Sequence, residues 1–262
     1  MTNLHQTAPV PAGPGRRVAI WQFLVAVVGY LVIVQGLTIA LASSGTGDHT
    51  VGSVDALVRS VVVPVGVGAA FVVVIAAWHG GWQRLFVVPR LRRWTLVLVA
   101  LLLVGIVAVT NYGGLAEVGL LHALVLLVAV LLVGFAEELL FRGIGVDAFR
   151  GAGHRERSVA IWTSVIFGLA HGSNAAITGD VPAAVLQVAL TTLTGALFYV
   201  VLRSTGMLVV SMAAHGLWDF GILSTQLDPS DPHALVNAAP VLVIVILLAV
   251  VVRRRRLTNA AG

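Results

Sequence analysis

The sequence predicts an all-α fold, a polytopic integral membrane bundle of about eight transmembrane helices. Three observations predict it. The mean hydropathy is +1.00, and 58% of the residues are hydrophobic. Only 10% of the residues are charged, against about 25% in an ordinary soluble domain. The apolar residues also fall into runs of about 20 residues, the length that crosses a bilayer as a helix. We therefore expect one membrane domain, not two soluble ones.

The spans can be assigned in order along the chain. Residues 1–17 are polar and rich in Pro and Gly, which predicts a disordered cytoplasmic tail. The run from Val18 to Ala42 is far longer than the 7–15 apolar residues of a signal peptide, so it is the first span. Seven further spans are predicted at Val61–Trp78, Trp94–Thr110, Val118–Phe141, Val159–Ala176, Ala183–Leu202, Met207–Leu223 and Leu235–Val252. The membrane domain then covers residues 18–252, and a cytoplasmic basic tail covers residues 253–262.

The arginines support this order, because cytoplasmic loops carry an excess of positive charge. With eight spans, both termini are predicted to be cytoplasmic, and only Arg59 lies in an outer loop. The predicted inner side holds Arg16, Arg17, Arg84, Arg90, Arg92, Arg93, Arg150, Arg155, Arg157, Arg203 and Arg253 to Arg256. The predicted outer loops hold Asp48, Asp55, Glu117, Asp180, Asp228 and Asp231. A missed or added span would destroy this segregation.

Several classes of function are excluded or disfavoured by composition. The net charge of +5 comes from basic residues scattered between apolar runs, without the aromatic-interleaved patch of a nucleic-acid site. The absence of cysteine excludes disulfides, thiolate metal sites and a cysteine nucleophile. The sequence contains no serine nucleophile elbow, no H-E-x-x-H motif and no Gly-rich phosphate loop.

Two acids and an arginine stand at the end of the fourth predicted span. From Val118 to Ala136 the only strongly polar side chain is His122, and Glu137 and Glu138 follow directly. An ionisable group at membrane depth costs at least about 2.5 kcal/mol, so it needs a partner or a function. Arg142 is one helical turn beyond Glu138, where it can form an ion pair with that residue and leave Glu137 free.

Two later spans also contain ionisable residues. The fifth contains His171, and the seventh contains His215 and Asp219, whose i to i+4 spacing places them on one helical face. Such groups are expected to face one another inside the bundle. A carboxylate and two imidazoles can activate a water, or can hold a divalent metal such as zinc. We therefore predict water-mediated hydrolysis at Glu137, His171 and His215, with these three also the candidate metal ligands.

The three motifs together resemble those of a known family. Glu137, Glu138 and Arg142 match E-E-x-x-x-R, Phe167 and His171 match F-x-x-x-H, and His215 and Asp219 match H-x-x-x-N/D. In this order they resemble the CPBP family, which comprises type II CAAX prenyl proteases and bacteriocin-processing proteins and is also called Abi. The motif-bearing stretch runs from about residue 118 to 220.

The resemblance implies an intramembrane endopeptidase that cleaves a peptide or membrane-protein substrate, such as a prenylated CAAX tail, within the lipid bilayer. Glu137 with His171 would activate water, and His215 with residue 219 would stabilise the oxyanion. Glu138 and Arg142 would hold the site together. Asp219 departs from the asparagine of the CAAX-processing members, and an ionised Asp cannot donate a hydrogen bond to an oxyanion. It could instead orient His215 or join a metal site.

Two other functions remain open on the sequence. One is a non-catalytic membrane immunity or scaffold protein of the same fold. The other is a proton-coupled transporter, which the absence of a visible two-half repeat disfavours. Measured from the inner ends of the predicted spans, Glu137, His215 and His171 lie at unequal depths of about 6, 12 and 18 Å. The active-site cavity is expected to open toward the cytoplasmic half of the bilayer.

Overall fold

A computed structural model describes residues 17–42, 51–91, 93–227 and 239–259 of the chain. The predicted tail at residues 1–16 lies outside these ranges, as do Arg92 and the predicted outer acids Asp48, Asp228 and Asp231. The last helix continues to Asn259, so residues 253–259 of the predicted basic tail are helical. The cytoplasmic placement of both tails stays a prediction.

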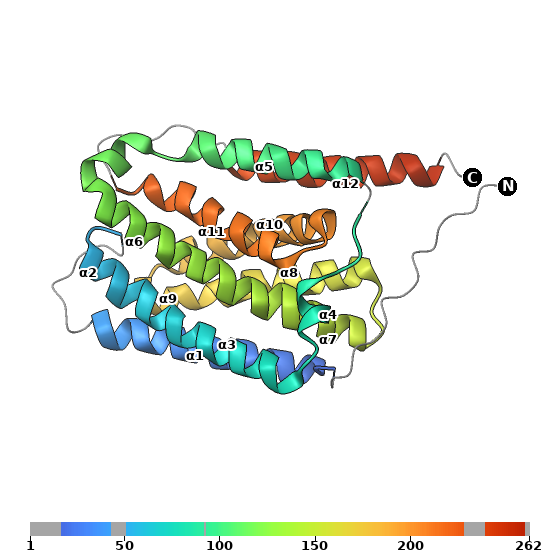
Figure 1. Cartoon of the computed structure of the whole chain (residues 1–262), viewed down its shortest axis with the longest axis horizontal. Helices are drawn as coiled ribbons and strands as arrows, with labels where there is room; N and C mark the ends of the chain where they lie inside the picture. The colour runs from blue at the N-terminus through green and yellow to red at the C-terminus, as the bar shows by residue number, and fades with distance from the viewer. Residues whose placement is uncertain (1–16, 43–50, 92, 228–238, 260–262) are drawn as a thin grey trace.

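Helices account for most of the described residues, and the long ones lie side by side along the long direction of the molecule (Figure 1). The α-helices are α1 Ile20–Ala42, α2 Val54–Leu57, α3 Val63–His79, α4 Trp82–Phe86, α5 Leu96–Val109, α6 Tyr112–Glu138, α7 Val146–Gly151, α8 Glu156–His171, α9 Ala175–Thr178, α10 Val181–Thr205, α11 Leu208–Ser224 and α12 Ala239–Asn259. Two π-helical segments, Val58–Val62 and Leu139–Gly145, join α2 to α3 and α6 to α7 without a break.

The membrane character of the bundle follows from the length and composition of its helices. Within the described chain, four segments are long and apolar enough to cross a bilayer, and three further apolar helices are shorter. The four are Ile20–Leu41, Val54–His79, Tyr112–Gly151 and Val181–Thr205, and the three are Leu96–Val109, Leu208–Ser224 and Ala239–Ala249. The amphipathic α8 brings the long helical segments of the described chain to the eight predicted positions. The all-α polytopic membrane bundle is thus confirmed.

The centre of the bundle is formed by α6, which packs against α11 and α3, while α8 packs against α10 (Figure 1). Two glycines let α6 and α11 touch backbone to backbone. A Cβ atom on Gly134 would lie 2.7 Å from the Gly216 nitrogen, and one on Gly216 would lie 2.8 Å from the Val130 carbonyl oxygen. Glu138 lies one helical turn after Gly134, and His215 directly precedes Gly216. The close contact of the two helices therefore brings these two side chains together.

Replacing Gly216 with alanine is expected to lower the thermal stability of the purified protein. The added methyl group would force the two backbones apart, and overpacking of this kind costs about 1–3 kcal/mol. Gly36→Ala on α1 is the matched control, because its Cβ would meet no atom within 4 Å and alanine favours the helix. Melting temperatures in detergent test this. Equal melting temperatures for the two variants would contradict the close contact.

The two ends of the bundle differ in charge. At one end Glu156 pairs with Arg150 at 2.6 Å and with Arg203, and Arg203 also donates to the Pro89 carbonyl oxygen at 2.9 Å. At the other end the Asn111 backbone N–H donates to Ser224 Oγ at 2.9 Å. The described arginines of the predicted inner loops thus gather at one end, as the sequence predicts. That this basic end faces the cytoplasm stays a prediction.

Candidate active site

The residues singled out in the sequence meet in the middle of the bundle. Glu137 and Glu138 end α6, Arg142 lies in the π-helical segment that follows, and His171 is the last residue of α8. His215 and Asp219 lie one turn apart on α11. The structure therefore brings all six predicted site residues, from three separate stretches of sequence, to one place.

Glu138 and Arg142 form a fully enclosed ion pair. Arg142 Nη1 lies 2.9 Å from Glu138 Oε1, and both side chains are 0% exposed. The guanidinium also donates from Nη2 to the Gly195 carbonyl oxygen at 2.9 Å and lies 4.2 Å from the centre of the Phe167 ring. Because Gly195 has no side chain, α10 can approach this closely: a Cβ there would lie 3.1 Å from Arg142 Nη2.

His215 is oriented by a contact between its Nδ1 nitrogen and Glu138. His215 Nδ1 lies 3.2 Å from Glu138 Oε1, and Ser211 Oγ donates to Glu138 Oε2 at 2.6 Å. The imidazole also stacks on the Phe198 ring, with centroids 4.4 Å apart. An ionised carboxylate accepts hydrogen bonds only, so Nδ1 carries a proton, and Nε2 faces the site. Sequence reasoning offered Asp219 as the orienting carboxylate, but Asp219 Oδ2 lies 3.4 Å from Nε2, on the opposite side of the ring.

Glu137 lies between the two imidazoles. Its Oε2 is 3.9 Å from His171 Nε2 and 3.9 Å from His215 Nε2. His171 Nδ1 must donate to the Phe167 carbonyl oxygen, 2.9 Å away, because a carbonyl can only accept. A neutral His171 therefore turns the lone pair of Nε2 toward Glu137. Glu137 Oε2 is buried and has no hydrogen-bond partner among the described residues, so it can accept a hydrogen bond from a water or a substrate.

The unequal depths counted from the sequence arise from where the predicted spans end. The fourth span does not end at Phe141, because the helix continues through the π-helical segment and α7 to Gly151. Glu137 is therefore about 20 Å from that end. His171 lies about 22 Å from the start of α8 at Glu156, which is nearly the same depth. Both residues therefore reach the middle of the bundle from the basic end.

The predicted metal ligands lie farther apart than the ligands of a tetrahedral zinc site. Two ligands of one tetrahedral zinc lie about 3.3 Å apart, given zinc bonds of about 2.0–2.1 Å to nitrogen and oxygen. Glu137 Oε2 is 3.9 Å from each imidazole nitrogen. No group of three His, Asp or Glu side chains in the described part of the chain is placed as metal ligands. As they lie, Glu137, His171 and His215 do not fit a metal ion.

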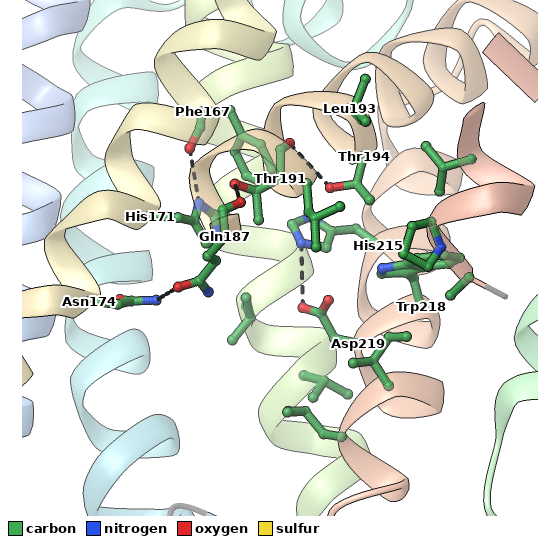
Figure 2. A pocket seen from close by; sticks show the side chains of 18 of the residues that line it. Phe167, His171, Asn174, Gln187, Thr191, Leu193, Thr194, His215, Trp218 and Asp219 are labelled. Atoms are coloured by element: carbon green, nitrogen blue, oxygen red, sulfur yellow. Dashed lines mark hydrogen bonds and ion pairs between the residues drawn. The ribbon is translucent and has the colours of Figure 1, made fainter. Parts of the chain in front are cut away.

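A chamber of about 610 Å³ adjoins these residues (Figure 2). His171, His215 and Asp219 form one end, and its walls come mainly from α10, α11 and α12. It extends along the first half of α10, away from the basic end of the bundle. The π-helical segment Leu139–Gly145, which is buried throughout, lies on the side toward the basic end. The opening toward the cytoplasmic half of the bilayer stays a prediction.

Sequence reasoning missed three residues that complete the site. Ser211 binds Glu138, Phe198 stacks on His215, and Gly195 accepts from Arg142. Ser211 could have been found, because it precedes His215 by four residues just as Asp219 follows it by four, which puts all three on one face of α11. Phe198 and Gly195 carry no such signal, since they belong to a different helix.

Comparison with known proteins agrees with the three motifs. Residues 119–221 match the family model described as type II CAAX prenyl endopeptidase Rce1-like, and this range contains all six candidate residues. No curated protein and no solved structure matches the chain.

Proposed function

On the premise of this family match over residues 119–221, we propose that the chain is an intramembrane endopeptidase whose water is activated by Glu137. Its substrate would be a membrane-associated peptide, such as a prenylated CAAX tail. One observation supports the proposal above the others. A buried carboxylate oxygen without a hydrogen-bond partner among the described residues lies 3.9 Å from the Nε2 nitrogens of two histidines, and these histidines line one end of the chamber.

The proposed reaction uses the chain's own residues and one water. Glu137 takes one proton from the water, and His171 Nε2 orients the water by accepting its second hydrogen. The hydroxide attacks the peptide carbonyl carbon, and the resulting oxyanion is stabilised by the Nε2–H of His215, which this proposal takes as an imidazolium protonated on both ring nitrogens. The C–N bond then breaks, and Glu137 returns the proton to the leaving amine. The products are a carboxylic acid and an amine, so atoms and protons balance.

Glu138 and Asp219 have supporting roles in this proposal. Glu138, fixed by Arg142 and Ser211, keeps the proton of His215 on Nδ1 and fixes the ring. Asp219 lies 3.4 Å from His215 Nε2 and would accept its N–H in the resting enzyme, until the substrate carbonyl oxygen takes that place.

His171→Ala is expected to lower cleavage at least about a hundredfold, because the water loses one of its two acceptors. The assay uses the full chain in vesicles and two quenched peptides, one with a farnesylated CAAX tail and one spanning the bilayer. His79→Ala is the matched control, since His79 Nδ1 makes the same bond to the carbonyl oxygen four residues earlier, Ile75, at 3.0 Å. Reaction in ¹⁸O water should place one ¹⁸O in the new carboxylate.

Cleavage that is absent in the wild type, or equal in the two histidine variants, would overturn the protease proposal and favour a non-catalytic membrane protein. Metal analysis of the purified wild type beside Glu137→Gln and His171→Ala tests the metal set predicted from the sequence. One equivalent of zinc that both variants lose would replace direct activation by Glu137 with a metal centre.

A further inference from the structure

A polar stripe runs along the chamber wall that α10 forms. Gln187, Thr191 and Thr194 succeed one another on one face of the helix, and all three line the chamber (Figure 2). All three are half-buried. Around them the same wall is apolar, with Leu186, Leu190 and Leu193. The stripe therefore provides polar atoms along an otherwise hydrophobic surface.

The stripe is anchored at one end by side-chain hydrogen bonds between three helical elements. Asn174 Nδ2 donates to Gln187 Oε1 at 3.1 Å, and Gln35 on α1 donates to Asn174 Oδ1 at 2.9 Å and to Ser173 Oγ at 2.7 Å. Ser173 and Asn174 lie two and three residues after His171 in the chain. The position of the stripe is thus tied to the position of a candidate catalytic histidine.

The threonine hydroxyls are left as hydrogen-bond acceptors. Thr191 Oγ1 donates its hydrogen to the Gln187 carbonyl oxygen at 2.6 Å, and Thr194 Oγ1 donates to the Thr191 carbonyl oxygen at 3.2 Å. A hydroxyl has one hydrogen and two lone pairs, so each oxygen can still accept a hydrogen bond from the chamber. The best partner for such an acceptor is an N–H group.

The spacing of Gln187 and Thr191 suits an extended peptide. Gln187 and Thr191 are about 6 Å apart along the helix axis, and Gln187 and Thr194 about 10.5 Å, at 1.5 Å per residue. In an extended chain, N–H groups on the same edge repeat every two residues, or about 6.6 Å. A peptide unwound for cleavage has exposed N–H and C=O groups, which must find partners inside a bilayer.

We propose that Gln187, Thr191 and Thr194 form a subsite that binds the main chain of an extended substrate beside the site of cleavage. The inference rests on the proposed protease function and adds how the substrate backbone is held. Main-chain recognition fixes the conformation of the substrate, and its side chains then contact the apolar parts of the chamber. Leu186 both lines the chamber and is 61% exposed, so the chamber reaches the lipid-facing surface there.

Thr191→Val tests the subsite against a closely matched control, Thr192→Val. Thr192 is the next residue of α10, and its Oγ1 donates to the Val188 carbonyl oxygen at 2.7 Å as Thr191 donates to Gln187, but Thr192 does not line the chamber. Both variants lose the same hydroxyl and the same bond to the helix. We expect Thr191→Val to raise KM for the farnesylated CAAX peptide about five- to tenfold, and Thr192→Val to leave KM unchanged.

Ester substitution in the peptide identifies the bonded group. In a series of farnesylated CAAX peptides, each amide next to the cleaved bond is replaced in turn by an ester, which removes one N–H. In the wild type and in Thr192→Val, at least one ester should raise KM about five- to tenfold. In Thr191→Val that same ester should have less than about a twofold effect, because its partner is already gone.

The outcomes separate this inference from the proposed function. If the wild type cleaves the peptide and His171→Ala does not, but Thr191→Val and Thr192→Val behave alike, the protease stands and the main-chain subsite is wrong. An ester that costs the same in Thr191→Val as in the wild type also contradicts the subsite. If the wild type cleaves no peptide, the proposed function fails, and the subsite fails with it.

Discussion

Glu137→Gln is expected to lower kcat by about three orders of magnitude, because the amide cannot take a proton from the water. The carboxylate oxygen Oε2 lies 3.9 Å from the Nε2 nitrogen of each imidazole, whereas Asp219 pairs with His215 alone among the described residues, so Glu137 is the carboxylate placed between the two histidines. Glutamine has the same shape, and the substitution should therefore leave KM and the fold almost unchanged. The measurement is steady-state cleavage of the quenched peptides in vesicles.

The same variant should be as stable as the wild type or more stable. Glu137 Oε2 is buried without a hydrogen-bond partner among the described residues, and a buried charge without a partner costs free energy. Removing that charge should therefore raise the free energy of unfolding while it abolishes the catalytic function of the residue. Glu117→Gln, an exposed position on the same helix, is the control and should change neither property. Full cleavage by Glu137→Gln, or a much lower melting temperature, would contradict the assigned role.

Glu138→Leu is expected to destabilise the protein severely. The Arg142 side chain is 0% exposed and would lose its carboxylate partner. Removing one partner of a buried ion pair costs about 3–5 kcal/mol of folding free energy. The double variant Glu138→Leu with Arg142→Leu should recover much of that stability, because no buried charge then lacks a partner. Thermal melts in detergent measure both effects.

Activity should not recover with stability in the double variant. His215 would lack the acceptor that holds Nδ1 at 3.2 Å, and loss of an orienting partner typically costs about 10–100-fold. Stability without activity would establish Glu138 as the residue that positions His215. A double variant with wild-type kcat would show instead that the ion pair serves folding alone.

The sequence indicated which ionisable residues would lie together because its motifs are local and chemically unusual. Charged residues inside apolar runs stand out without any knowledge of the fold, and the i to i+4 spacings of Glu138 with Arg142 and of His215 with Asp219 hold in the structure. The number of long helices could be predicted for a similar reason, since a bilayer requires apolar runs of fixed length.

The relative placement of the helices was harder to predict. The stretch after Arg142 contains two glycines and the charged residues Asp147 and Arg150, which favour the end of an apolar span, yet the helix continues to Gly151. This continuation sets the depth of Glu137. Likewise, which carboxylate stands behind His215 depends on the approach of α6 to α11 at Gly134 and Gly216, a contact between residues far apart in the sequence.

Phe167 connects the two parts of the site. Its ring centroid lies 4.2 Å from the Arg142 guanidinium carbon, 4.7 Å from the centroid of His171 and 5.6 Å from that of His215. One aromatic side chain thus contacts the structural cation through a cation–π interaction and packs against both imidazoles. The first letter of F-x-x-x-H therefore couples the buried ion pair to the two histidines, so a smaller side chain there would loosen both at once.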